Sequence, residues 1–332
     1  MRSPGAGSSG QSVTLQDVAR EAGVAVSTVS RALSNPDRVS RAMRERVQEV
    51  ARRLGYASVQ PRVRGSLLAL LVSGIANPYN VTLIRGVESQ SRAVGASLIV
   101  GDIADGPEVE LALVGRLRDR GVDGIVLASS VLPEAELRSV GRQAEVVLFN
   151  REAAGLPCVV TDSRDGSRQI VEHLAALGHR SIAYLAGPSA LWTDNERWRG
   201  LSENGARLGV DIVRLGPFMP TLDQGSPAAD VGLGSGATAL VAFNDLLAIG
   251  VLQRLRRRNV DVPGAISVVG YDNILGAEFC HPSLTTLHSA VEHAGRTLVD
   301  LVQGRILSRP DTPIVIPTRL VVRESTGPVS SI

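Results

Sequence analysis

A short run of hydroxyl side chains ending in an arginine is the first group of residues in this sequence that could do chemistry. Its members are Ser27, Thr28, Ser30 and Arg31. In a helix these residues point away from the side on which the apolar Val29 lies. Hydroxyl and guanidinium groups hydrogen-bond phosphate oxygens, and arginine also donates two hydrogen bonds to the edge of a guanine. The run therefore favours contact with a nucleic acid.

Three predicted helices position this run. Thr14, followed by Asp17, forms a capping-box-like start, and the apolar positions 15, 18, 19 and 22 share one helix face. Gly23 ends that helix, a second helix begins near Val26, and a third begins at Ser40. The arrangement predicts a helix-turn-helix unit whose second helix enters the major groove of DNA. The alternative is a three-helix module that binds another protein.

The charge distribution favours DNA over that alternative. Residues 1–64 contain 11 Arg and 5 Asp or Glu, a net charge of +6, whereas residues 65–332 carry −4. A small basic domain attached to an acidic body indicates a polyanion partner for the small domain alone. No run approaches the roughly 18 apolar residues that cross a membrane. The two cysteines lie far apart without metal-ligand spacing, so we expect a cytoplasmic protein with no metal and no cofactor.

From residue 66 onward, apolar runs alternate with helical stretches. The runs are LLALLV, SLIVGD, DGIVLAS, VVLFN, CVVTD, SIAYLAG, ALVAFND and ISVVGYD. Continuous apolar strands separated by helices are typical of parallel sheets covered on both faces. About ten strands over this length predict an α/β region of two doubly wound lobes with a cleft between them.

Polar residues follow several of these strands, at the edge where doubly wound sheets bind ligands. They are Asn77, Tyr79, Ser129, Asn244 and Asp272. Such groups hydrogen-bond hydroxyls or stack on a ring, which suits a polar, sugar-like ligand, that is, a sugar or a related polyol or nucleoside. Two alternatives stay open, because Asn77 precedes a proline that starts helices and Asp272 could cap the segment after it. His173 and His179 are not at strand ends, and we expect them to be structural.

The opening residues resemble the lactose-repressor (LacI/GalR) family of bacterial regulators. That family begins with a pattern similar to TLxDVAxxAGVSxxTVSRxLN, which residues 14–34 match except at Ala25 and Ser34. Further landmarks in the family's order are residues 75–79, 121–125, 172–174 with 178–180, 243–245, 266–272, 282–287 and 322–326. The resemblance implies a periplasmic-binding-protein-like body, a homodimer and an allosteric repressor of transcription.

The resemblance also assigns roles to particular residues. It places Val26, Ser27 and Arg31 at bases and Thr28 and Ser30 at phosphates, with Thr14 beside them. It adds Trp192, Arg197 and Phe218 to the effector site. A core position for Trp192 and a surface ion pair for Arg197 are the alternatives.

Two segments depart from the family pattern. Residues 57–66 lack the leucine of the family's hinge helix and contain Pro61, so we expect a plain linker whose Arg62 and Arg64 contact phosphate. Between Phe218 and Ala239 the chain is rich in glycine and proline, and we expect a mobile loop there instead of a helix.

The predicted domains are a disordered leader over 1–12, the helix-turn-helix over 13–56, the linker over 57–65 and the effector domain over 66–328. Lobe 1 comprises about 66–160 and 288–312, and lobe 2 about 161–287 and 313–327. A sugar-binding transport protein or a sugar-acting enzyme on the same fold is the alternative function. We expect no enzyme, because no nucleophile elbow, phosphate loop or metal cluster is recognisable.

Overall fold

The computed structural model describes residues 15–34, 39–40, 43, 46–47, 49–50, 53, 67–104, 106–306 and 312–329. The chain divides into two compact units, one of residues 1–66 and one of residues 67–332. No helix of the described residues is long and apolar enough to cross a membrane.

The small unit contains helices α1 (Leu15–Ala22) and α2 (Val26–Ser34). Every described position from 43 to 53 is also helical, and the Ser40 hydroxyl accepts a hydrogen bond from the Met43 backbone N–H at 3.4 Å. The core of this unit is apolar and consists of Val18, Ala19, Ala22, Val29, Ala32 and Val47. Gly23 has φ +65°, the left-handed conformation in which the first helix was predicted to end.

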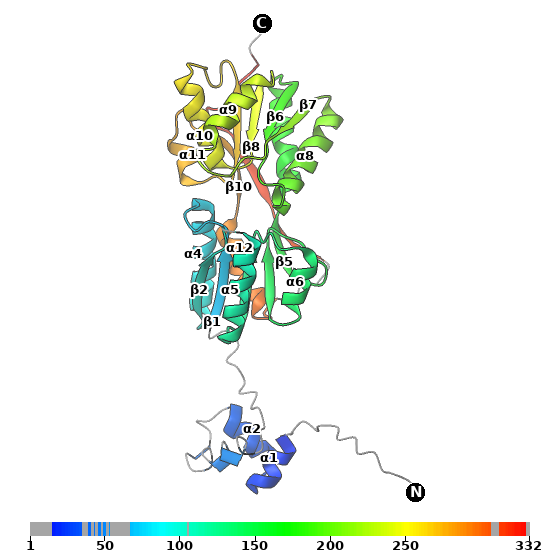
Figure 1. Ribbon diagram of the computed structural model, residues 1–332, viewed down its shortest axis with the longest axis vertical. Coiled ribbons are helices and arrows are strands. Elements are labelled where there is room, and N and C mark those ends of the chain that lie inside the picture. The colour runs from blue at the N-terminus through cyan, green and yellow to red at the C-terminus, as the bar shows by residue number, and fades with distance from the viewer. Residues whose placement is uncertain are drawn as a thin grey trace, which may run out of the picture. The chain divides into compact units, whose positions relative to one another are not determined.

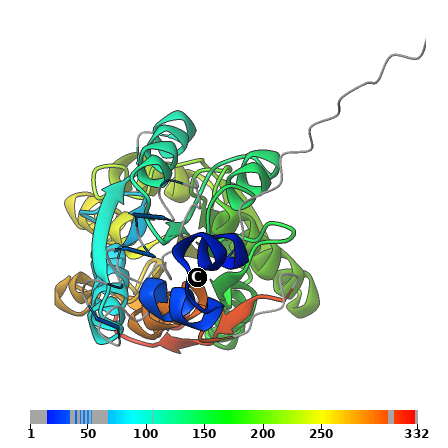
Figure 2. The ribbon, with the colours of Figure 1, turned by 90° about the horizontal axis from the view of Figure 1, so that it is seen from below.

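The large unit is built on two six-stranded sheets, each covered by helices on both faces (Figure 1). The strands of the first sheet, in spatial order, are β11 (Ile314–Ile316), β5 (Cys158–Thr161), β4 (Val146–Phe149), β3 (Gly124–Ala128), β1 (Leu67–Val72) and β2 (Ser97–Asp102). All of its strands are parallel. Strand β2, cyan in Figure 2, forms one open edge.

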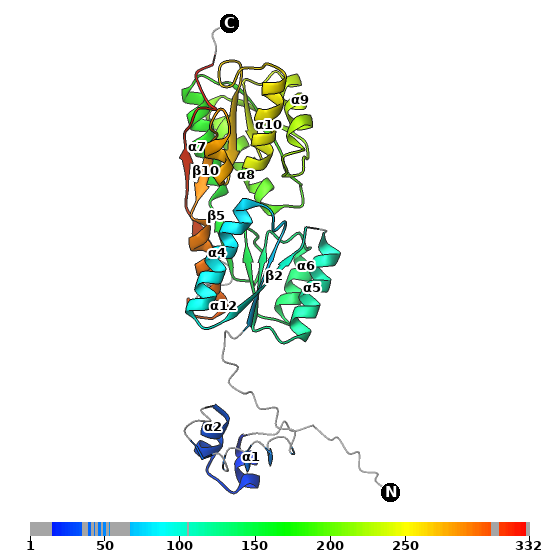
Figure 3. The same ribbon diagram turned by 90° about the vertical axis from the view of Figure 1, so that its left-hand side faces the viewer.

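Alternating side chains of the buried strand β1 explain the layers of this first lobe. Leu68 and Leu70 pack on the face that carries α4 (Pro78–Ala93) and α12 (Val291–Val302). Ala69 and Leu71 pack on the opposite face with α5 (Pro107–Asp119) and α6 (Glu134–Gly141). Figure 3 shows α4 and α12 on one side of the sheet and α5 and α6 on the other.

The second lobe repeats this plan. Its strands, in spatial order, are β12 (Thr318–Val321), β10 (Thr285–Ser289), β9 (Ser267–Tyr271), β8 (Ala239–Ala242), β6 (Ser181–Leu185) and β7 (Asp211–Leu215). Its helices are α7 (Ser163–Ala176), α8 (Trp192–Leu208), α9 (Gly225–Gly234), α10 (Asp245–Arg257) and α11 (Leu275–Phe279). Helices α7 and α8 pack on one face, and α9, α10 and α11 on the other. These two lobes bear out the predicted α/β class.

Two details differ from the prediction. Strand β12 pairs antiparallel with β10, so the second sheet is not wholly parallel. Strand β11 pairs with β5 in the first sheet, which places the third crossing between Ile316 and Thr318 and not near residue 312. The predicted boundary was early because a three-residue strand next to Pro317 carries little periodicity.

The segment after Phe218 also differs from the prediction, because helix α9 occupies residues where a mobile loop was expected. Pro227 is the third residue of α9, where the backbone N–H has no partner within the helix. Gly225 permits close packing on α10, since a Cβ there would lie 2.1 Å from the Gly250 carbonyl carbon. The glycines and proline that suggested a loop therefore serve helix packing and helix initiation.

Candidate functional site

A small polar cavity lies where the chain crosses between the two lobes. Its volume is about 20 Å³. It is lined by Tyr79, Thr161, Asp162, Ser163, Arg197, Tyr271, Asp272, Leu287, Ser289 and Thr318. Three of these, Thr161, Ser289 and Thr318, are the terminal residues of strands at the crossings. The cavity is therefore bounded by both lobes and by the strands that connect them.

Arg197 of α8 forms the centre of the cavity wall on the second lobe. It is only 6% exposed, and its guanidinium carbon lies 4.6 Å from the Phe243 ring centroid and 4.3 Å from that of Tyr271. One guanidinium nitrogen donates to the Phe243 carbonyl, and another donates to Asp272 Oδ1 at 3.3 Å. Its Nε is buried without a hydrogen-bond partner among the described residues. Arg197 is thus a buried cation, and the alternative of a surface ion pair is wrong.

Asp272 directly follows β9 and has φ +107°. Burial raises its pKa to about 6, although the adjacent Arg197 lowers it. At neutral pH the carboxylate and the guanidinium therefore face each other as an ion pair in a nearly closed space. The following helix α11 has Ile274 as its N-cap with no side-chain cap bond, so the structure shows no capping by Asp272 there.

Tyr79 of α4 contributes the wall from the first lobe. Its hydroxyl accepts a hydrogen bond from Asn150 Nδ2 at 3.0 Å. Asn150 Oδ1 in turn accepts from the backbone N–H and the hydroxyl of Thr161, at 2.9 and 3.1 Å. Burial raises the pKa of Tyr79 far above its usual value, so its hydroxyl keeps its proton. This side of the cavity is neutral and is fixed to the first crossing strand.

The other residues predicted for the effector site do not line this cavity. Asn77 Oδ1 accepts from the Tyr79 backbone N–H at 3.0 Å, and Asn244 Oδ1 accepts from that of Leu247 at 3.0 Å, so each caps a helix. Ser129, with φ +56°, follows β3. The remaining two are aromatic residues in apolar surroundings. Trp192 packs against the core of the first lobe and Phe218 belongs to the core of the second.

Sequence reasoning missed several residues that line or support the cavity. They are Asn150, Thr161, Asp162, Ser163, Tyr271, Leu287, Ser289 and Thr318. The signals for Asn150 and Asp162 were present, since these residues directly follow the apolar runs VVLF and CVVT. Strand β10 and the segment at Thr318 gave no comparable signal, because neither is a continuous apolar run.

The two histidines lie in structural networks, as predicted. His179 Nδ1 is 2.8 Å from the Thr238 hydroxyl, and its Nε2 is 3.0 Å from that of Ser267. His173 Nε2 is 2.9 Å from the Thr326 hydroxyl. Burial lowers the pKa of both rings, which keeps them neutral at physiological pH.

In the small unit, five of the residues predicted to contact DNA lie on α2. The Ala25 carbonyl accepts from the backbone N–H groups of Thr28 and Val29 at 2.8 and 3.1 Å, which starts the helix without a side-chain cap from residue 25. Val26 is 42% exposed, Ser27 is also exposed, and Thr28 is half-buried. Ser30 and Arg31 lie on α2, but their side chains are outside the described part of the structure. Thr14, Arg62 and Arg64 lie outside the described residues altogether.

Comparison with known proteins identifies both units. Residues 14–58 match the model of the bacterial regulatory proteins of the lacI family, and residues 171–326 match a periplasmic binding protein-like domain. The HTH-type transcriptional repressor CytR of Escherichia coli (strain K12) is 31% identical over 332 residues, which covers 94% of this chain and 96% of that protein.

Solved structures of transcriptional regulators are also similar to this chain. A complex of the transcriptional regulator CelR with cellobiose has a TM-score of 0.70 and 30% identity, covering 94% of this chain and 99% of that one. The Lac repressor dimer bound to operator and the anti-inducer ONPF has a TM-score of 0.72 and 27% identity, covering 96% and 100%. The helix-turn-helix, the two lobes and these relatives agree, and the chain belongs to the lacI family of DNA-binding transcriptional regulators.

Proposed function

We propose that this regulator binds operator DNA as a homodimer and that a polar, sugar-like effector bound between the lobes sets its affinity for DNA. The observation that carries this proposal is the Arg197–Asp272 pair, buried at the junction of the lobes. Each charge can hydrogen-bond ligand hydroxyls, and Tyr79 approaches from the other lobe. A buried ion pair contributes little net stability by itself, so its placement in a cavity favours a binding role.

The effector is proposed to act by stabilising the closed lobes. A cavity of about 20 Å³ has room for little more than one water molecule, which needs roughly 10–15 Å³. A sugar therefore enters only when the lobes part or the wall rearranges, and a bound ligand shifts the population between such states. The complex of the related CelR with cellobiose supports a carbohydrate as the ligand class.

For the DNA interface we keep the predicted residues. Val26, Ser27 and Arg31 would contact bases, and Thr28 and Ser30 phosphates, with Thr14, Arg62 and Arg64 adding backbone contacts. Support comes from the exposure of Val26 and Ser27 on α2, a helix that packs on the core of the small unit through Val29 and Ala32. The short linker is proposed to cover residues 57–65.

A homodimer is proposed because one short helix reads too few base pairs for specificity. Helix α11 offers an apolar surface for such an interface, since Leu275 and Phe279 are 71% and 73% exposed. The related Lac repressor was solved as a dimer on its operator. We propose no catalytic activity, and we place the protein on chromosomal DNA in the cytoplasm.

Replacing Arg31 tests the DNA interface. DNA selected from a random pool by the full-length protein would be footprinted and then titrated with wild type and Arg31→Ala. We expect a two-fold-symmetric footprint and a loss of about 1–3 kcal/mol for the selected site, with relaxed preference at one base pair in each half-site.

Arg53→Ala is the matched control, because Arg53 is an exposed arginine of the same unit that pairs with Glu21. If Arg31→Ala lost affinity equally for selected and random DNA, Arg31 would be a phosphate contact and its base-reading role would be refuted.

A further inference from the structure

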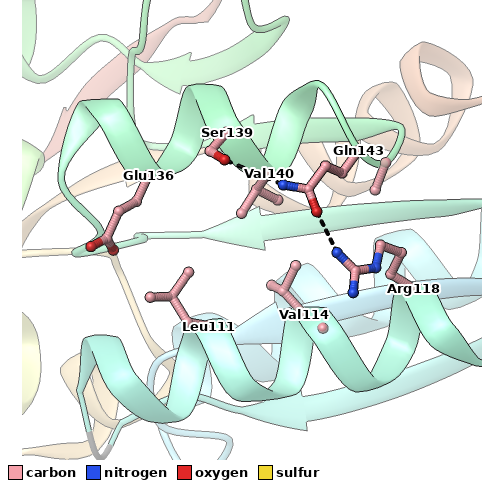
Figure 4. Close-up of a pocket in the computed structure, with 9 residues that line it drawn as sticks. Leu111, Val114, Arg118, Glu136, Ser139, Val140 and Gln143 are labelled. Carbon is pink, nitrogen blue, oxygen red and sulfur yellow. Dashed lines mark hydrogen bonds between the residues drawn. The ribbon is translucent and has the colours of Figure 1, made fainter.

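A second groove, larger than the cavity between the lobes, lies on the outer face of the first lobe between α5 and α6 (Figure 4). Its volume is about 240 Å³, against about 20 Å³ for the cavity between the lobes. The lining residues are Leu111, Val114, Gly115, Arg118, Glu136, Ser139, Val140, Gln143 and Ala144. No role in effector or DNA binding has been assigned to any of them above.

The two ends of the groove differ in how well their polar groups are satisfied. At one end the Arg118 guanidinium donates to Gln143 Oε1 and, at 2.9 and 3.1 Å, to Asp119 Oδ1. At the other end, Oε2 of Glu136 is buried and has no hydrogen-bond partner among the described residues. Figure 4 shows the carboxylate of Glu136 near Leu111, across from the Arg118 end. An unpartnered buried carboxylate oxygen is costly, which favours a donor from outside the chain.

The charges near Glu136 favour a cation as that donor. Glu110, fully buried on α5, accepts from the Val131 backbone N–H at 3.3 Å and has a second oxygen without a partner among the described residues. Its pKa is raised by burial and also by Glu136, so the two carboxylates are close enough to interact. Among the described residues Arg151 lowers the pKa of Glu110; it donates to the Leu132 carbonyl at 3.2 Å, and its Nε is also buried without a hydrogen-bond partner there. Two carboxylates therefore face one arginine.

The rest of the groove is mostly apolar; its one polar lining residue, Ser139, accepts a hydrogen bond from Gln143 Nε2 at 3.3 Å. Val114 and Val140 are buried on facing sides of the groove, one on each helix. Gly115 leaves space open, because a Cβ built there would meet no atom within 4 Å. An apolar trough with an unpaired carboxylate at one end matches a molecule with a short alkyl chain and a cationic head.

We propose that the α5–α6 groove is a second small-molecule site, which binds a primary alkylammonium of about six carbons with its ammonium at Glu136 and its chain over Val114 and Val140. Such an amine is a cation at pH 7.5, since its pKa is about 10.4. The site is separate from the effector cavity, so the proposal does not depend on the proposed effector.

The test is calorimetric titration of the full-length protein with hexylammonium chloride, with hexanol and hexanoate as neutral and anionic analogues. Hexylammonium should bind with a Kd of about 1 mM, hexanol about tenfold more weakly, and hexanoate not measurably. Glu136→Gln should weaken hexylammonium about tenfold and leave hexanol unchanged. Glu134→Gln is the matched control, because Glu134 is an exposed carboxylate of the same helix. Its Oε1 lies 3.9 Å from a guanidinium nitrogen of Arg138.

A second pair of variants tests the trough itself. Gly115→Leu should abolish binding by filling the groove, whereas Gly115→Ala should preserve it, and both should fold because they replace a glycine inside a helix. Equal affinity for hexylammonium and hexanol would overturn the proposal. Unchanged binding by Glu136→Gln or by Gly115→Leu, or no binding by the wild type, would overturn it as well.

Discussion

The small and large units of this protein place the residues proposed to recognise DNA and effector in opposite environments. Every buried residue described in the small unit is apolar; of the described positions proposed to contact DNA, Val26 and Ser27 are exposed and Thr28 is half-buried. In the large unit the central charges, Arg197 and Asp272, are buried between two lobes. In the proposed function, a polyanion as large as DNA meets an exposed surface of a basic unit, whereas a small polar effector meets charges withdrawn from water. The two interactions should therefore respond differently to salt, to substitution and to pH.

The largest expected difference is in salt dependence. With about six phosphate contacts per dimer, log affinity for operator should fall with a slope of about −5 against log salt, a loss of roughly a thousandfold between 50 and 200 mM. Effector binding should change little, because a buried pair is screened weakly. Anisotropy titrations for DNA and calorimetry for the effector measure both. A DNA affinity that is independent of salt would show that contacts with phosphates do not drive DNA binding.

The next largest effect is expected from breaking the buried pair. Arg197→Ala and Asp272→Asn should each weaken effector binding by about 1–3 kcal/mol or more, because each leaves its partner unsatisfied in the cavity. Operator affinity without effector should be retained. Arg254→Ala is the control, since Arg254 pairs with Asp230 at 2.7 Å in a partly exposed ion pair of the same lobe. A normal effector response by both cavity variants would place the effector elsewhere.

A smaller effect concerns the pH dependence of folding. Asp272 has a pKa of about 6 in the folded protein, above the value of about 3.9 in an unfolded chain. The folded state thus binds this proton more tightly, so the associated stabilisation is present below about pH 4 and is lost as the pH rises to about 6.

Chemical unfolding of the wild type and Asp272→Asn across this range measures the effect. Glu110 titrates alike in both proteins and cancels in the difference, whereas the pKa of Asp245 is raised partly by Asp272 and is lower in the variant. The stability of the wild type relative to the variant should decrease from pH 4 to about pH 6 and then level off. A stability difference between the two proteins that does not change with pH would show that folding does not raise the pKa of Asp272.

The smallest expected effect is on DNA shape. Residues 57–65 contain Pro61 and no large apolar side chain beyond two valines, so we predict that the linker does not wedge into the minor groove. Operator bending should be well below the 20–90° that wedges produce. A circular-permutation assay measures the bend, and a sharp central kink would refute this prediction about a segment outside the described residues.

The fold could be predicted from sequence where strands are buried on both faces. The eight apolar runs correspond to β1–β6, β8 and β9, and all but the edge strand β2, which has no buried residue, are central strands. Of the four remaining strands, β7, β11 and β12 lie at sheet edges, whereas β10 is buried but too rich in threonine to form an apolar run. Edge strands mix polar and apolar residues, so they lack the continuous apolar pattern.

The cavity could be predicted only in part. Tyr79 and Asp272 were predicted to bind the effector because they come after strand ends, and Arg197 because of the family resemblance. Asn77 and Asn244 also follow strands, but their side chains cap helices, and a sequence pattern does not separate a cap from a ligand-binding amide. Thr161, Ser289 and Thr318 end or begin strands at the three crossings between the lobes. They line one cavity only because these crossings lie side by side, which depends on tertiary packing.

The most direct test of the account is whether an effector that occupies the cavity changes affinity for DNA. Carbohydrates that raise the melting temperature of the full-length protein would be added to an operator titration of wild type and Arg197→Ala. The account predicts that such a sugar changes wild-type operator affinity by about 5-fold or more, a coupling of about 1 kcal/mol, and leaves that of the variant unchanged. A sugar that binds the wild type through Arg197 without altering operator affinity would contradict it.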